Sequence, residues 1–299
     1  MNIKPWIQAA RLRTLPLSVS GIIVGSAYAN YQGFSDWRIV VLALLTTLGL
    51  QVLSNYANDY GDGVKGTDAN RIGEKRLVAA GIITAEQMKK AVIITAIFTF
   101  IIALLLIYVA FGKENFALSL IFILLGIGSI GAAIKYTVGK SAYGYSGFGD
   151  VFVFIFFGLV SVIGSNFLFT HFIDWKLFLP ASAIGLLSVA VLNLNNMRDI
   201  ENDTIAGKNT LIVQYGLKFG IWYQRVLIFL PFILFALFYL LIQEKLPPLI
   251  AVSISFMFVH NNNISRVKCP KEFDPELKKV ALNTFALSIL FWLTLVFLD

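Results

Sequence analysis

Long apolar runs recur along the whole of this chain and limit its fold more than any other feature. Each is long enough to cross about 30 Å of hydrocarbon as a helix. The runs lie near residues 15–31, 39–58, 91–111, 116–134, 151–170, 177–194, 221–242, 246–263 and 280–298. The first and the eighth are the weakest spans. Because 58% of the 299 residues are hydrophobic and only 14% are charged, a water-soluble globule would expose too much apolar surface. The sequence therefore predicts an integral membrane protein.

A backbone that crosses lipid must satisfy its own hydrogen bonds, so the crossing segments are helices or strands of a closed β-barrel. Apolar residues here are continuous rather than alternating, which favours helices. Lysine and arginine gather on the side of the spans that holds the N-terminus, and few fall on the other side. Those few are Arg38, Lys113, Lys176 and Lys245. By the positive-inside rule, the N-terminus is predicted to be cytoplasmic in one all-α membrane domain, residues 1–299, of about nine transmembrane helices.

The net charge of +7 does not indicate nucleic-acid binding. Most basic residues lie in loops beside the spans, where topology and anionic lipid headgroups account for them. The single cysteine, Cys269, provides neither a disulfide framework nor a cysteine-based metal site. The long polar loops fall near 59–90, 135–150, 196–220 and 261–279, all on the predicted cytoplasmic side. We therefore expect the chemistry of this protein at its cytoplasmic face.

Two of these loops share a pattern of amide and acid side chains. Asn55 and Asp59 recur as Asn195 and Asp199, an offset of 140 residues in both cases. Each pair ends an apolar span and is followed by another acid and then by lysine and glycine. The repeat predicts two pseudo-repeated halves of about four helices each.

If the helical period continues to the end of each span, Asn55, Asp59 and Asp62 project from one face, as do Asp199 and Asp203. Four carboxylates at one cavity repel one another unless cations lie between them. All-oxygen ligands favour magnesium, which takes one or two carboxylates per ion and completes its shell with water and substrate phosphates. The alternative is that these acids are loop residues paired with nearby basic side chains. The presence of two matching clusters favours a magnesium site that holds a diphosphate.

Basic side chains in the same loops are candidates to neutralise such a diphosphate. They are Lys65, Arg71, Arg76 and Lys208. A metal-bound diphosphate is a good leaving group, and an allylic carbon released from it becomes a carbocation. That cation needs a site without water and benefits from nearby aromatic faces, both of which a cavity in a helical bundle can supply.

The two acidic segments read NYANDYGDGVKGTD from residue 55 and NNMRDIENDTIAGKNTL from residue 195. Together they resemble the paired aspartate motifs of the UbiA-type intramembrane prenyltransferases. The first is most similar to the branch that prenylates 1,4-dihydroxy-2-naphthoate on the route to menaquinone. Further matches are ARLRTLP from Ala10, RLVAAG from Arg76, YTVGKSAYGYSGFGD from Tyr136, and the FFG ending at Gly158.

Some positions depart from the family pattern. The family commonly has proline where Leu12 stands, and Gly-Pro where Gly139 and Lys140 stand. The benzoate-type branch has an acid where Gly66 stands, so the first motif argues against that branch. The change after Gly139 bears on the acceptor pocket, and 4-hydroxybenzoate therefore remains an alternative acceptor.

The resemblance implies a ring of nine helices around a central cavity that opens toward the cytoplasm and toward membrane lipid. It places Mg²⁺ and the diphosphate of a polyprenyl diphosphate donor on four acids with two amide neighbours: Asp59, Asp62, Asp199, Asp203, Asn55 and Asn195. In the naphthoate branch, the ring carbon that bears the carboxylate attacks the prenyl cation, and carbon dioxide is lost to give demethylmenaquinol. Residues beyond about 220 carry no diagnostic motif.

Three further residues have a functional interpretation and a structural one. Arg11 and Arg13 present planar forks that fit the acceptor carboxylate, or they fix the topology of the first span. Tyr143 contacts the acceptor ring or assists deprotonation, or it is an interfacial aromatic residue. We read Lys135 as a topology signal and assign His260 no role.

A secondary transporter is the alternative from another class, because duplicated halves with polar residues in the membrane are also typical of transport folds. Transporters place their sites near the bilayer midplane, whereas the acids here fall at cytoplasmic helix ends. The sequence therefore favours a magnesium-dependent aromatic prenyltransferase in the inner cell membrane.

Overall fold

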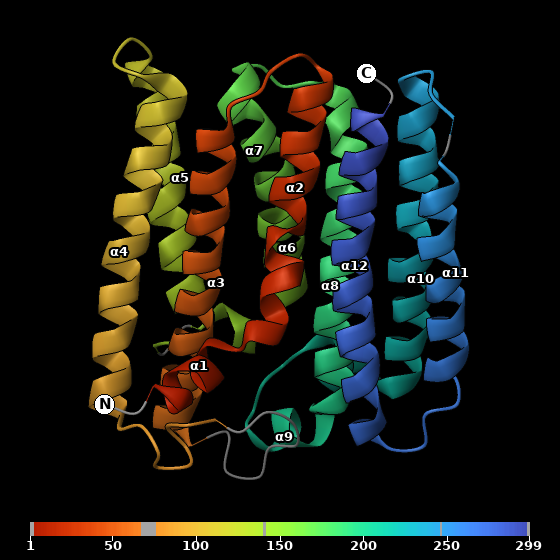
Figure 1. Cartoon of the computed structure of the whole chain (residues 1–299). Helices are drawn as coiled ribbons and strands as arrows, with labels where there is room; N and C mark the ends of the chain where they lie inside the picture. Colours follow the sequence, from red (N-terminus) through yellow and green to blue (C-terminus); the bar gives the residue numbers. More distant parts are fainter. Residues whose placement is uncertain (1–2, 67–75, 140–141, 246, 298–299) are drawn as a thin grey trace.

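The computed structural model of the chain consists of helices joined by turns and loops, with no strand, in the part that it describes, residues 3–66, 76–139, 142–245 and 247–297 (Figure 1). Seven helical segments are long and apolar enough to cross a membrane. They are Trp37–Lys65, Ala85–Phe111, Phe116–Lys135, Gly149–Thr170, Trp175–Arg198, Leu211–Leu241 and Pro270–Val296. The prediction of an all-helical, multi-pass membrane protein is confirmed, and seven of the nine predicted spans are among these candidates in the described residues.

The two weakest predicted spans form the helices α2 (Leu15–Tyr31) and α11 (Pro248–Ile264), of 17 residues each. This length is the lower end of the roughly 17 to 25 residues that a spanning helix needs. The other long helices are α3 (Trp37–Lys65), α4 (Ala85–Phe111), α5 (Phe116–Lys135), α8 (Phe178–Arg198), α10 (Leu211–Leu241) and α12 (Phe273–Val296). The short ones are α1 (Lys4–Ala10), α6 (Gly149–Val153), α7 (Ser161–Thr170) and α9 (Ile200–Ile205).

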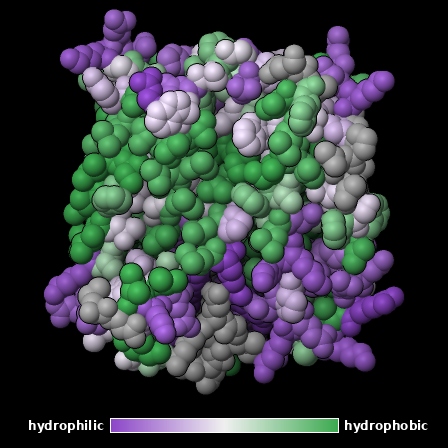
Figure 2. Space-filling view, viewed as in Figure 1, coloured by the Kyte–Doolittle hydropathy of each residue, from purple (hydrophilic) through white to green (hydrophobic). Residues whose placement is uncertain are grey.

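The long helices stand side by side, and the two ends of the chain lie at opposite ends of the bundle (Figure 1). The helices α3, α4 and α5 pack on one another, as do α8, α10, α11 and α12. The helix α2 packs against α3, α7 and α12 and so connects these groups. Hydrophobic residues cover the middle of the visible face and hydrophilic residues gather at both ends (Figure 2), as expected of a bundle that sits in a bilayer.

The helix α3 continues through the first acidic motif, as the sequence predicts. It ends at Lys65, and the next residue, Gly66, has a φ of +72° in the left-handed region that favours glycine. An acid here, as in the benzoate-type pattern, would place a Cβ in a strained conformation. The first acidic motif is therefore helical up to Lys65, and the chain leaves the helix at Gly66.

A π-helix, η3 (Phe154–Val160), joins α6 to α7. Such turns are rare and occur frequently at functional sites. The FFG segment falls inside η3, and its residues Phe156 and Phe157 both line the central cavity described below.

Candidate active site

A cavity of about 440 Å³ lies inside the bundle. Its polar end is formed by the last turns of α3 and α8 and by the segments after them, and its apolar part reaches Ile107 of α4 and Leu168 of α7. Many of the predicted site residues line it. These are Arg11, Arg13, Asn55, Asp62, Arg76, Tyr143, Asn195, Asp199, Asp203 and Lys208.

Asp62 is the centre of the first acidic cluster. Its side chain is 1% exposed, and Nη2 of Arg76 lies 3.2 Å from its Oδ2 atom. The hydroxyl group of Tyr145 donates a hydrogen bond of 2.7 Å to the Oδ1 atom. Such charge-assisted bonds hold a buried carboxylate in one orientation.

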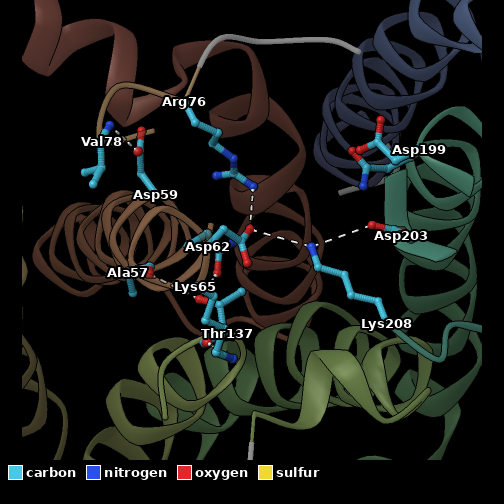
Figure 3. Close-up of polar contacts among 12 residues, drawn as sticks. Ala57, Asp59, Asp62, Lys65, Arg76, Val78, Thr137, Asp199, Asp203 and Lys208 are labelled. Atoms are coloured by element: carbon cyan, nitrogen blue, oxygen red, sulfur yellow. Dashed lines mark hydrogen bonds and ion pairs between the residues drawn. The ribbon is translucent and has the colours of Figure 1, made fainter. Parts of the chain in front are cut away.

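Lys208 joins the two acidic clusters across the cavity (Figure 3). Its Nζ atom lies 3.7 Å from Oδ2 of Asp62 and 3.6 Å from Oδ1 of Asp203. Asp203 comes from α9, whereas Asp62 comes from α3. A single ammonium group therefore lies between carboxylates that come from distant parts of the chain.

The carboxylate of Asp59 has different partners from that of Asp62. Its two oxygen atoms each accept a backbone N–H bond of 3.0 Å, from Leu77 and from Val78. Asp59 does not line the cavity, although the sequence pairs it with Asp62 as a metal ligand. In this structure it holds the segment that carries Arg76, and metal binding by Asp59 stays a prediction.

The second acidic cluster contains an arginine of its own. Arg198, at the end of α8, donates from Nε to Oδ1 of Asp199 and from Nη2 to Oδ2, both at 2.8 Å. Its Nη2 atom also donates to Oδ1 of Asn195 at 2.6 Å, and its Nη1 atom donates to Asp274 of α12. The guanidinium group therefore ties the second motif to α12.

The Asn and Asp pairs that line the cavity have a different offset from the repeat that the sequence predicts. At the end of α3 they are Asn58 and Asp62, and at the end of α8 they are Asn195 and Asp199. The offset between these pairs is 137 residues rather than 140. Asn55 also lines the cavity, but its Nδ2 atom donates to the backbone oxygen of Ala10 at 2.8 Å.

Lys65 lies next to residues that line the cavity. Its Nζ atom donates a 2.8 Å bond to the backbone oxygen of Thr137 and lies 3.9 Å from the centre of the Tyr145 ring. Lys65 is not among the residues that line the cavity, so its contact with a diphosphate stays a prediction. Arg71, predicted for the same role, lies outside the residues that the structure describes.

Arg11 and Arg13, of the ARLRTLP segment, both line the cavity. Arg13 lies 3.4 Å from Oδ2 of Asp274 through its Nη1 atom. Arg11 has a left-handed backbone, with φ of 51°, between α1 and the following turn. For a residue other than glycine this conformation costs about 1 to 2 kcal/mol, and Arg11 lines the cavity in this conformation.

Tyr143 packs its ring against the aromatic wall. The ring stacks on Phe152 with centroids 3.9 Å apart, and the hydroxyl group donates a 2.9 Å bond to the backbone oxygen of Ala132. Burial raises the pKa of Tyr143 to about 12. Its hydroxyl group is therefore neutral at physiological pH and already bonded, which favours ring contact over proton abstraction.

The donor chemistry of the cavity fits magnesium. Its three acids and its asparagines offer oxygen atoms, the ligands that this ion prefers. Within the described part of the chain, no three acid, histidine or cysteine side chains converge closely enough to hold a metal ion. Arginine and lysine side chains engage the carboxylates instead, so a divalent cation would displace some of these contacts.

Three residues of the site were missed from sequence, whereas Arg198 is one of the basic residues that the alternative interpretation pairs with the acids. Asn58 precedes Asp62 by four positions, which is the spacing of Asn195 and Asp199, and this signal was available. Tyr145 stands in a recognised motif beside Tyr143. Asp274 carries no sequence signal, because it lies 76 residues from Arg198 and the two meet only in the folded chain.

The family of the chain follows from comparison with known proteins. The model of the UbiA prenyltransferase family matches residues 18–273. The chain belongs to this family. The resemblance drawn from the acidic motifs is therefore confirmed.

Two relatives of this UbiA-family protein carry the same functional name. It is 41% identical to a 1,4-dihydroxy-2-naphthoate octaprenyltransferase of Haemophilus influenzae, over 99% of this chain and 96% of the relative. It is 50% identical to the 1,4-dihydroxy-2-naphthoate octaprenyltransferase of Escherichia coli, over 71% of this chain and 68% of the relative.

Solved structures of UbiA homologs share the fold. A homolog from Archaeoglobus fulgidus bound to DMAPP and Mg²⁺ aligns with a TM-score of 0.67 at 14% identity, over 98% of this chain and 99% of that one. The apo structure of a homolog from Aeropyrum pernix aligns with a TM-score of 0.70 at 14% identity, over 97% and 98%. The arrangement of helices is therefore that of the UbiA family.

Proposed function

We propose that this protein transfers a polyprenyl group from an allylic polyprenyl diphosphate to 1,4-dihydroxy-2-naphthoate, with loss of carbon dioxide, to give demethylmenaquinol. The observation that carries this proposal is one cavity with Asp62, Asp199 and Asp203 at its polar end and aromatic residues along its wall. The functional names of the relatives support the choice of acceptor and an octaprenyl chain.

The polar end suits a diphosphate. Arg76 and Lys208 line it and bring positive charge beside the acids. The first cluster, with Asp62, and the second, with Asp199 and Asp203, would each contribute one or two carboxylates to Mg²⁺, which when bound supplies the positive charge that neutralises the leaving diphosphate. Arg76 and Lys208 then exchange carboxylate partners for phosphate oxygens, which are equally suited to them.

The apolar part suits the prenyl group and its cation. Phe122, Phe152, Phe156 and Phe157 line the cavity, and their ring faces favour a nearby positive charge. Apolar side chains of the surrounding helices line this part of the cavity and would keep water from the allylic carbon.

The bonds of the reaction balance without an added base. The allylic carbon–oxygen bond breaks, and the diphosphate leaves with both electrons. The ring carbon that bears the carboxylate bonds to the allylic carbon, and carbon dioxide leaves the electron pair of its bond to the ring. No ring proton has to be removed, which agrees with a neutral Tyr143 whose hydroxyl group is bonded to Ala132. Arg11 and Arg13 line the same cavity and are proposed to bind the acceptor carboxylate.

The proposed setting is the inner cell membrane. The seven spans together with α2 and α11 give nine crossings in a ring around the cavity, with the N-terminus in the cytoplasm. The chain ends lie at opposite ends of the bundle, which supports an odd number of crossings. The acids lie at helix ends rather than at the midplane, which is unlike a transporter site.

Product identity tests this proposal. Purified protein in detergent is incubated with Mg²⁺, octaprenyl diphosphate and either 1,4-dihydroxy-2-naphthoate or 4-hydroxybenzoate, and the products are weighed by mass spectrometry. We expect a prenylated naphthoquinol that lacks the carboxylate, and no such product from Asp199→Asn. Prenylation of 4-hydroxybenzoate alone would replace the acceptor, and absence of product with both acceptors would contradict the proposal.

A further inference from the structure

Arg198 occupies the carboxylate that the second motif would offer to a metal ion. Its side chain is 1% exposed, and its Nε and Nη2 atoms bond the two oxygen atoms of Asp199, each at 2.8 Å. This paired geometry is the strongest arrangement between an arginine and a carboxylate. A divalent cation that binds the remaining lone pairs of these oxygen atoms would lie close to the guanidinium group, and the two positive charges would repel each other.

Asp274 holds the other side of the same guanidinium group. Its Oδ1 atom accepts from Nη1 of Arg198, and its Oδ2 atom lies 3.4 Å from Nη1 of Arg13. The side chain of Asp274 is 36% exposed, whereas that of Asp199 is 2% exposed. One arginine is therefore shared between a deeply buried acid and a more accessible one.

We propose that Arg198 is a built-in counter-ion that competes with a divalent cation for Asp199, and that Asp274 is the anchor that keeps Arg198 when the cation binds. This inference rests on the proposed function, because it requires a metal ion at the cavity acids. The balance between the two acids sets the affinity of the site for the cation.

The charges explain why such an arrangement is useful. A buried carboxylate without a partner is costly, so Asp199 needs a positive charge when no metal ion is present. A bound divalent cation would repel a guanidinium group that stays on Asp199. A shift of Arg198 toward Asp274 removes the repulsion and leaves the arginine paired, so that neither state contains an unpaired buried charge.

The test measures Mn²⁺ binding to the purified protein by electron paramagnetic resonance, without substrates. Manganese prefers the same oxygen ligands as magnesium. Arg198→Lys keeps the charge but loses the fork that spans both acids, and we expect its affinity for Mn²⁺ to rise about fivefold or more. Asp274→Asn removes the anchor, and we expect its affinity to fall by about the same factor.

The control is Arg225→Gln. Arg225 bonds Asn261 and Ser265 on α11 and the turn after it, and its loss should leave Mn²⁺ affinity unchanged. If the net charge of the site alone set the affinity, Arg198→Lys would bind like the wild type, and that result overturns the inference. Should Arg198→Lys not fold, Asp274→Asn decides the question, since an unchanged affinity there overturns it as well.

Failure of the proposed function gives a different result. In that case the wild-type protein shows no Mn²⁺ binding that Asp203→Asn removes, and the metal site itself is excluded. If Asp203→Asn removes binding while both test variants bind as the wild type does, only the role of Arg198 and Asp274 is excluded.

Discussion

The hydroxyl group of Tyr145 donates a 2.7 Å hydrogen bond to the Oδ1 atom of Asp62. The same ring lies 3.9 Å from Nζ of Lys65 and 4.9 Å from Nζ of Lys208. Tyr145, from the loop between α5 and α6, thus orients the carboxylate of Asp62 and packs against Lys65 and Lys208. The site depends on this loop as much as on the acidic motifs.

Tyr145→Phe keeps the ring and removes the bond to Asp62. A hydrogen bond to a charged group contributes about 1.5 to 3 kcal/mol, so we expect kcat/KM for the diphosphate donor to fall about tenfold or more. The control is Tyr215→Phe, at an exposed position of α10. Equal kcat/KM for the wild type and Tyr145→Phe would exclude a role of this bond.

Gly61 permits the close approach of α3 to the loop at Thr137. A Cβ at Gly61 would lie 2.9 Å from both the backbone oxygen and Oγ1 of Thr137. Thr137 in turn bonds Oδ1 of Asn58 and accepts from Lys65. Gly61→Ala should therefore move these partners and destabilise the protein by about 1 to 3 kcal/mol.

Thermal unfolding in detergent measures this effect. Gly128→Ala is the matched control, because a Cβ at Gly128 of α5 meets no atom within 4 Å, and its melting temperature should equal or exceed that of the wild type. If Gly61→Ala has the same melting temperature as Gly128→Ala, the close approach at Thr137 does not constrain the site.

Burial of the Tyr143 hydroxyl group makes the stability of the protein depend on pH. Its pKa is raised from 10.0 to about 12 by burial, so the neutral form is favoured in the folded state. The resulting stabilisation is complete below pH 10 and is lost as the pH rises from about 10 to about 12. We expect the melting temperature of the wild type to fall more steeply in this window than that of Tyr143→Phe. Parallel curves would contradict the assignment.

The sequence specified the helices and the acids well, because both leave local patterns. Apolar runs of spanning length are visible without any tertiary contact, and the Asn and Asp residues of α3 and α8 keep helical spacing. The two runs judged weakest, α2 and α11, are also the two helices with only 17 residues. Whether these two helices span the membrane depends on their packing against neighbouring helices, which the sequence does not display.

The sequence offered nearby basic side chains as partners of the acids, but it did not show which partner each acid takes. Asp59 and Asp62 stand three residues apart, yet one binds the backbone of Leu77 and Val78 while the other faces the cavity. This difference arises from how the segment after residue 75 folds back on α3. In the same way, Asp274 reaches Arg198 only because α12 packs against α8.

The residue His260, to which the sequence assigned no role, belongs to a buried polar network. Its Nδ1 atom lies 2.6 Å from Oε2 of Glu276, whose Oε1 atom accepts from Asn263 and Lys279. Its Nε2 atom contacts Gln224 of α10 at 3.2 Å. The network joins α10, α11 and α12 in the half of the protein that carries no motif.

Removal of the central acid should destabilise this half. We expect Glu276→Ala to lower the free energy of unfolding by about 3 kcal/mol, because it leaves buried polar partners unmatched. Lys279→Met, whose side chain is 60% exposed, should lower it by less than about 1 kcal/mol. Thermal unfolding in detergent compares the two variants, and equal melting temperatures would show that the network adds no stability.

The coupled release of carbon dioxide and diphosphate tests the central claim most directly. The purified protein is given Mg²⁺, octaprenyl diphosphate and 1,4-dihydroxy-2-naphthoate labelled in its carboxylate, and both released products are counted. We expect equal amounts of labelled carbon dioxide and diphosphate from the wild type, and neither from Asp62→Asn. Label that stays in the prenylated product, or undiminished release from Asp62→Asn, would contradict the account.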